Sequence, residues 1–307
     1  MSSLVLKVDV DTFVGTREGV PRLLDLFARE GIIATFFFSL GPDNSGKAVK
    51  RIFRKGFVKK VLRANPAASY GLKTMLYGTL LTAPDIGRDE VARKAMRAAL
   101  AAGHECGIHA WDHVDWHDRL TRMPDPEVEE TVRREHERFR EIFGFAARVS
   151  AAPGWTATVA SGAAQEAMGI EATSDTRGGA PFRPLKEDGT AAAYVEVPST
   201  LPTLDELLAF DEFGASAAAR ERTAVHLARL VREAPGLHVH SIHTEIEGGK
   251  ALGELFSRQL KAWKEDGVSF VTLGAAAADV QRAGPVPARP LVFGTLPGRA
   301  TPVARQG

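Results

Sequence analysis

The 307-residue sequence contains one cysteine, Cys106. A single thiol cannot form an internal disulfide, which fits a reducing compartment such as the cytoplasm. No uninterrupted apolar run approaches the roughly 18 residues that span a bilayer, so we expect no transmembrane helix. A strand-like run begins at residue 4, so we expect no charged segment and apolar core of a signal peptide.

An excess of charge of one sign is also missing, because the formal net charge is +1. We therefore expect no overall attraction to nucleic acid. A hydrophobic content of 44% with 25% charged residues argues against disorder. The length suits one large α/β domain or two small ones, and the chain shows no internal repeat and no convincing domain boundary.

One window departs from this balance. Between Asp43 and Asp85 there is no acidic residue, whereas nine residues are basic. Apolar residues recur there at helical spacing, so we expect a basic amphipathic helical insertion over 43–85 that faces an anionic membrane. A solvated basic helix packed on the domain is the alternative; nucleic acid is disfavoured because no recognition motif is present. The expected lipid-phosphate contacts are Lys50, Arg51, Arg54, Lys55, Lys59, Lys60 and Arg63.

The rest of the chain alternates between strand-like and helix-like segments. Strands are expected at 4–10, 32–38, 104–109, 148–151, before 175, and at 194–197, 237–242 and 268–273. Strands joined by helices predict a parallel α/β architecture, in which sites form at the carboxyl ends of the strands. We expect one domain over 1–283 and a mobile tail over 284–307, which is rich in Pro, Gly and Arg.

Ionisable residues gather at several of these strand ends. Asp9 and Asp11 lie two residues apart, which puts both carboxylates on one face of a strand. His109, His113 and His117 follow another strand at intervals of four. Either motif alone is weak, because isolated aspartates and histidines are often surface or core residues. Together, two imidazoles and one carboxylate are typical of a catalytic divalent metal site, and zinc, manganese and cobalt fit equally well.

These motifs resemble the polysaccharide deacetylases of the NodB homology type. The resemblance implies a distorted (β/α) barrel of seven or eight parallel strands, with Asp9 as base and Asp11, His109 and His113 as ligands of one divalent metal ion. The second motif has Ala110 where the family has Ser or Thr. Residues 150–155 lack the arginine that the family orients toward the base, and Arg177 is a candidate replacement.

The resemblance extends to a late strand whose terminal histidine is the general acid. His243 matches it, with His238 and His240 as rivals, whereas Asp175 would orient His243 or bind substrate. His117 lies beyond the motif and is better interpreted as a pocket or surface residue.

Longer stretches, 8–13, 15–24, 36–44, 109–113, 152–155, 174–178, 181–184 and 242–248, resemble the deformylase branch of this family. That branch removes the N-formyl group from 4-deoxy-4-formamido-L-arabinose on undecaprenyl phosphate, at the cytoplasmic face of the inner membrane. Its product modifies lipid A and confers resistance to cationic peptides such as polymyxin. Expected substrate contacts are Trp111, Trp155, Asp175 and Arg177. The alternatives are a de-N-acetylase of peptidoglycan or a chitin-like oligosaccharide, and a membrane-bound scaffold with a structural metal.

Overall fold

The computed structural model describes residues 2–48, 73–214, 216–249, 252–297, 299 and 301–307. Most of the basic insertion lies outside the described residues, including the seven expected lipid-phosphate contacts between Lys50 and Arg63. Its helix and its membrane contact therefore stay predictions. In the described part of the chain, no helix has both the length and the apolar character that crossing a bilayer requires.

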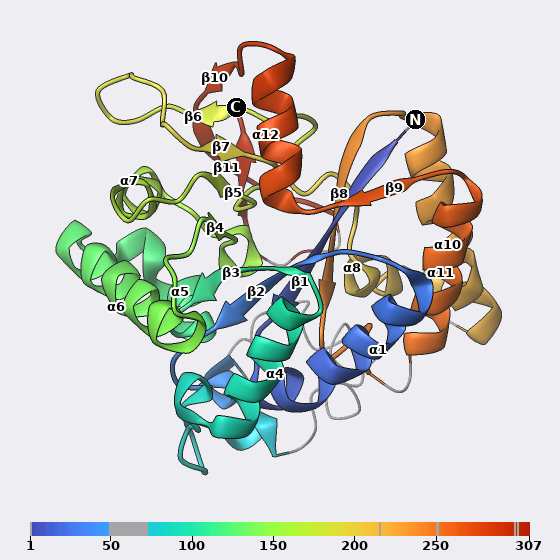
Figure 1. The fold of residues 1–307 in the computed structure, drawn as a ribbon, viewed down its shortest axis with the longest axis horizontal. Coiled ribbons are helices and arrows are strands. Elements are labelled where there is room, and N and C mark those ends of the chain that lie inside the picture. Colours follow the sequence, from blue (N-terminus) through green and yellow to red (C-terminus); the bar gives the residue numbers. More distant parts are fainter. Residues whose placement is uncertain (1, 49–72, 215, 250–251, 298, 300) are drawn as a thin grey trace.

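Parallel strands form the centre of the fold (Figure 1). The strands of this eight-stranded sheet are β1 (Ser3–Val10), β2 (Thr35–Ser39), β3 (Glu105–Ala110), β4 (Val149–Ser150), β5 (Ala172–Thr173), β7 (Val195–Glu196), β8 (Leu237–His243) and β9 (Ser269–Val271). They follow the order β7-β5-β4-β3-β2-β1-β8, and β9 also pairs with β1. The path ends at β7 and β8. The segment that follows β7 reaches β8, where the backbone N–H groups of Thr200 and Leu201 donate to the carbonyl of Val239. The predicted distorted barrel of parallel strands is confirmed.

Strand β1 is the centre of this sheet. It pairs with β8 from Ser3 to Asp9, whereas β9 and β2 share its other edge. Seven of its eight residues are buried, because the sheet is covered on both faces as parallel sheets usually are. A lysine, Lys7, stands among them with only 1% of its surface exposed.

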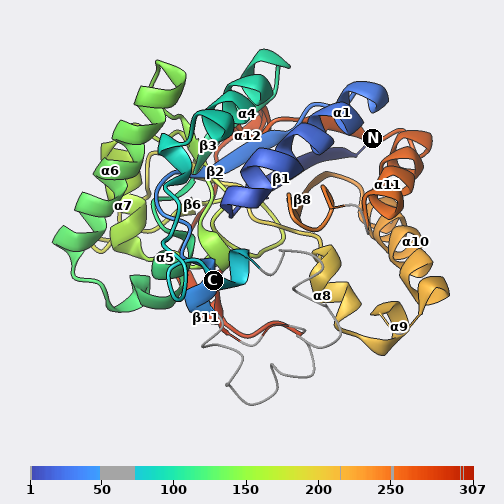
Figure 2. The ribbon, with the colours of Figure 1, turned by 90° about the horizontal axis from the view of Figure 1, so that it is seen from below.

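Helices surround the strands (Figure 1). They are α1 (Val20–Glu30), α4 (Glu90–Ala101), α5 (His113–Arg119), α6 (Asp125–Phe143), α7 (Val159–Ala167), α8 (Leu204–Leu208), α9 (Asp211–Gly214), α10 (Ala217–Glu233), α11 (Gly253–Glu265) and α12 (Leu273–Ala283). Their ends follow the sequence: Gly31 closes α1 with a left-handed φ of 64°, and the Asp89 side chain caps the first turn of α4. Figure 2 shows α5, α8 and β11 together on the side opposite α1 and α4.

The C-terminal segment differs from the expected mobile tail. Within 284–307 lie β10 (Ala288–Arg289), which pairs with β6 (Arg183–Pro184), and an antiparallel hairpin of β11 (Leu291–Gly294) and β12 (Val303–Gln306). Val303 and Ala304 are fully buried, and the Ala304 carbonyl accepts the backbone N–H of Arg177 at 2.9 Å. The expectation rested on composition, which does not register the short apolar runs that pair here. The single domain over 1–283 stays a prediction.

Candidate metal centre and active site

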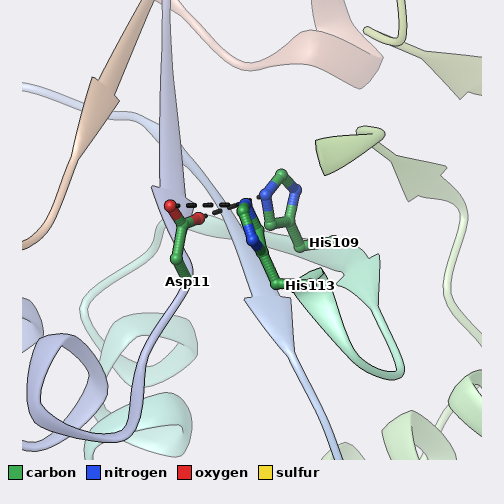
Figure 3. A group of neighbouring side chains, drawn as sticks. All are labelled: Asp11, His109 and His113. Atoms are coloured by element: carbon green, nitrogen blue, oxygen red, sulfur yellow. Dashed lines mark ion pairs between the residues drawn. The ribbon is translucent and has the colours of Figure 1, made fainter. Parts of the chain in front are cut away.

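Asp11, His109 and His113 meet at the carboxyl ends of the central strands (Figure 3). Asp11 follows β1, His109 belongs to β3, and His113 opens α5. The Asp11 Oδ1 atom lies 3.2 Å from His109 Nε2, and Asp11 Oδ2 lies 3.5 Å from His113 Nε2. One ligand atom from each residue lies within 4.8 Å of the other two. The structure thus brings together the three residues that the motifs predicted as ligands.

Neighbouring backbone groups orient the two imidazoles. His109 Nδ1 lies 2.6 Å from the Ala151 carbonyl, to which it can donate only as N–H, so Nε2 keeps its lone pair for the site. His113 is held by the start of α5, where the Asp112 carboxylate accepts the N–H groups of Val114 and Asp115, each at 3.0 Å. Asn44 Nδ2 in turn donates to Asp112. These contacts preorganise the ligand set.

The charge of Asp11 suits a metal cation. Burial raises the pKa of its carboxyl group, but His113, His109 and His243 outweigh burial and lower the pKa far below its ordinary value. An ionised carboxylate and two imidazoles fit a divalent metal such as zinc, manganese or cobalt. His117 is not part of this group; its Nδ1 lies 3.5 Å from Asp118.

Asp9 lies beside the ligands and is paired with a cation that the motifs did not reveal. Its Oδ2 atom is 3.4 Å from Lys7 Nζ, whose side chain is 1% exposed. Its buried Oδ1 atom has no hydrogen-bond partner among the described residues, so this atom can accept a proton. Lys7 is therefore the cation beside Asp9, a position for which the sequence suggested Arg177. Arg177 instead pairs with Glu206, at 3.0 Å.

His243 faces Asp9 from the adjacent strand, because the β1–β8 register pairs the two residues directly. Burial of the ring lowers its pKa, but the carboxylates of Asp11, Asp205, Asp9 and Glu247 outweigh burial and raise the pKa to about 9. The ring is thus protonated at neutral pH. Asp205 Oδ1 lies 4.0 Å from His243 Nδ1, and Asp205, unlike Asp175, is among the carboxylates that raise the pKa of this ring.

The two rival histidines of β8 make contacts in the core. His238 Nε2 lies 2.6 Å from the Ala234 carbonyl, and the His240 ring packs edge-on against Trp263. Burial, Arg177 and His243 lower the pKa of His240 to about 3, so its ring is neutral. Of the three histidines, His243 is the one placed opposite Asp9.

Asp175 contacts the backbone that orients His109. Its carboxylate accepts the Ala152 N–H at 2.7 Å, next to the Ala151 carbonyl that orients His109. Burial, reinforced by the nearby Glu196 carboxylate, raises the pKa of Asp175 to about 8. Its contacts are those of a residue that positions this turn.

The two tryptophans expected at the substrate differ in their surroundings. Trp155 is buried, and Lys7 Nζ lies 5.2 Å from the centroid of its ring, so Trp155 is close to Asp9. The Trp111 ring instead packs on Gly41 and under the guanidinium groups of Arg134 and Arg138. Contact of either ring with a sugar stays a prediction.

Comparison with known proteins agrees with this geometry. A family model described as polysaccharide deacetylase matches residues 3–173. A probable 4-deoxy-4-formamido-L-arabinose-phosphoundecaprenol deformylase ArnD of Shewanella sediminis (strain HAW-EB3) is 37% identical over 87% of this chain and 83% of its own. A protein of the same description from Wigglesworthia glossinidia brevipalpis is 28% identical over 95% of this chain and 98% of its own.

The chain therefore belongs to the polysaccharide deacetylase family, as the motifs predicted. The crystal structure of a probable polysaccharide deacetylase from Pseudomonas aeruginosa PAO1 has the same fold. It superposes with a TM-score of 0.62 at 16% identity and covers 92% of each chain.

Replacement of Lys7 by Met tests its role beside Asp9. The neutral side chain leaves a buried carboxylate without its cation, so we expect turnover to fall by about 10- to 100-fold with little change in KM. Metal content, measured on the purified protein, should stay the same. Lys264→Met, which removes an exposed lysine from α11, is the matched control. Undiminished turnover in Lys7→Met would show that Asp9 does not need this cation.

Replacement of Asp205 by Asn tests the partner of His243. A general acid must be protonated, so activity is lost as pH rises through the raised pKa of His243. Loss of the Asp205 charge lowers that pKa, and the alkaline limb of the kcat profile should move by about 0.5 to 1 pH unit toward lower pH. Asp188→Asn, which changes an exposed aspartate, should leave the limb in place. An unmoved limb in Asp205→Asn would rule out this pairing.

Proposed function

We propose that this protein is a metal-dependent deformylase. It hydrolyses the N-formyl group of 4-deoxy-4-formamido-L-arabinose carried on undecaprenyl phosphate, and it releases formate and the free amine. The observation that carries the proposal is the pairing of Asp9 with His243 across adjacent strands, beside the ligand group of Asp11, His109 and His113. The similarity to proteins described as deformylases supports formyl rather than acetyl as the group removed.

The chemistry divides between the metal and the residues of the chain. A divalent ion held by Asp11, His109 and His113 would polarise the formyl oxygen and lower the pKa of a water molecule. Asp9 Oδ1 accepts the proton of the attacking water, while Lys7 balances the charge of the Asp9 carboxylate. His243 donates a proton to the departing nitrogen as the C–N bond breaks, because an unprotonated amine is a very poor leaving group.

The charge of the product explains what the reaction is for. Deformylation turns a neutral formamide into an amine that is cationic at neutral pH. Transfer of this sugar to lipid A would offset phosphate charge and weaken the attraction of cationic peptides such as polymyxin. We infer a peripheral location on the cytoplasmic face of the inner membrane, because the proposed substrate is carried on a membrane lipid. The basic residues of 43–85 support this location, because the window holds nine basic residues and no acidic residue between its end points.

Side-by-side assay of formyl and acetyl substrates tests the reaction. We expect the metal-loaded protein to release formate from the lipid-linked formamido sugar, and chelation to stop the release. Asp9→Asn should keep its metal, because Asp9 is not among the ligands, yet lose at least about 100-fold in turnover with its base.

Metal content and formate are measured on the same samples, so that loss of the base is separated from loss of the ion. Release of acetate without formate would replace the proposal by de-N-acetylation. Full activity of Asp9→Asn would remove the assigned base.

Charge reversal within the basic insertion tests membrane attachment. Exchange of Lys50, Arg51, Arg54 and Lys55 for Glu should release the protein from vesicles that contain anionic lipid, since each well-placed cation adds on the order of 1 kcal/mol. Sedimentation with vesicles at low and moderate salt measures the bound fraction. Binding that survives both the exchange and moderate salt would contradict an electrostatic attachment.

A further inference from the structure

Three cations surround the indole ring of Trp155. Lys7 Nζ lies 5.2 Å from a ring centroid of this residue, and the guanidinium carbons of Arg177 and Arg299 lie 4.8 and 4.6 Å away. The Trp155 backbone has a φ of 53°, a left-handed conformation that bulky residues rarely adopt. Its Nε1 donates to Ser199 Oγ at 2.9 Å. The surrounding structure thus holds the ring in a strained conformation, close to Lys7 and to the two arginines.

The two arginines share one close carboxylate. Arg177 Nη1 lies 3.0 Å from Glu206 Oε2, and Arg299 Nη1 lies 3.3 Å from Glu206 Oε1. The third cation, Lys7, is already paired with Asp9. Asp205, which adds a weaker attraction for Arg177, lies against His243. The group of Arg177, Glu206 and Arg299, which we call the arginine triad, therefore carries one positive charge in excess.

The triad also has a hydrogen-bond donor that meets no acceptor in the described part of the chain. The Nε atom of Arg299 is buried and has no hydrogen-bond partner among the described residues. A buried N–H of a charged group without an acceptor is costly, and native structures seldom keep one unless a ligand or water completes it. The free donor and the excess charge both point to an anion.

The triad lies beside the catalytic residues although its members are far apart in sequence. Glu206 belongs to α8, next to Asp205, which faces His243. Arg299 lies between β11 and β12, and β12 packs against the turn of Pro153–Trp155. Figure 2 shows β11 on the same side of the molecule as α5 and α8. The C-terminal hairpin thus carries Arg299 to the edge of the active site.

We propose that the arginine triad binds the phosphodiester that joins the sugar to its lipid. The inference rests on the proposed function, because that substrate carries a phosphodiester on the same sugar ring as the scissile N-formyl group. A guanidinium offers a planar set of donors that matches phosphate oxygens. One excess positive charge equals the single negative charge of a phosphodiester. The triad would select lipid-phosphate-linked sugars over uncharged glycans.

Two substrates that differ only in the phosphate test this role. One is the methyl phosphodiester of the 4-formamido sugar, and the other is the methyl glycoside of the same sugar. In Arg299→Gln we expect kcat/KM for the phosphodiester to fall by about 10- to 100-fold, mostly through KM. The value for the methyl glycoside should stay unchanged. Arg299→Lys, which keeps the charge but loses the planar donors, should fall between wild type and Arg299→Gln.

Arg289→Gln is the matched control, because it removes an exposed arginine from the same C-terminal segment. It should leave both substrates unaffected. An equal loss for both substrates in Arg299→Gln would assign Arg299 a structural role and overturn the inference. Unchanged activity on both substrates would also overturn it. Thermal melting of each variant identifies a folding defect, in which case Arg299→Lys decides.

A binding titration separates failure of this inference from failure of the proposed function. Its probe is the prenyl phosphodiester of an unmodified pentose, which has no formyl group. If the probe binds Arg299→Gln more weakly than wild type and neither formyl substrate releases formate, only the deformylase proposal is contradicted. Equal binding of the probe to wild type and to Arg299→Gln would contradict the proposed phosphodiester site.

Discussion

The pairing of β1 with β8 is the constraint on which the site depends. The ladder runs from Ser3 to Asp9 and ends where Asp9 stands opposite His243. A shift by one residue would turn one of these two side chains to the other face of the sheet. The same end of β1 leads to Asp11, so the register sets the proposed base, the proposed acid and one proposed metal ligand together. Because β1 is buried on both faces, the apolar residues of the core fix this register.

Burial makes the site electrostatically demanding. Lys7, Asp9, Asp11 and His109 are each less than a tenth exposed, and a buried charge is tolerated only when it is paired. Lys7 pairs with Asp9, and Asp11 lies against the two histidines. Each pair keeps an acceptor atom or ring nitrogen directed at the space where chemistry would occur. The arrangement is one of preorganised charge, in which little reorientation is needed during reaction.

The residues that sequence could identify are those that end strands in a spaced motif. Asp11, His109 and His113 were found in this way, because apolar runs mark the strands that carry them. Lys7 and Asp205 were missed because their partners come from contacts that spacing does not encode. A signal for Lys7 did exist: a charged residue in an apolar strand that is buried on both faces must have a partner. Arg299 offered no such signal, because only the folded C-terminal hairpin brings it to Trp155.

The position of β8 next to β1 also has a consequence for biosynthesis. Strand β1 is made first and β8 late, yet β8 covers one whole edge of β1. Until residues 237–243 have been synthesised, that edge is an apolar strand with open hydrogen-bonding groups, the kind of surface that pairs with other chains. A nascent chain that already contains Asp11, His109 and His113 would therefore remain prone to aggregation. Chaperone binding during synthesis would act during this interval, before His243, the proposed general acid, has been paired with Asp9.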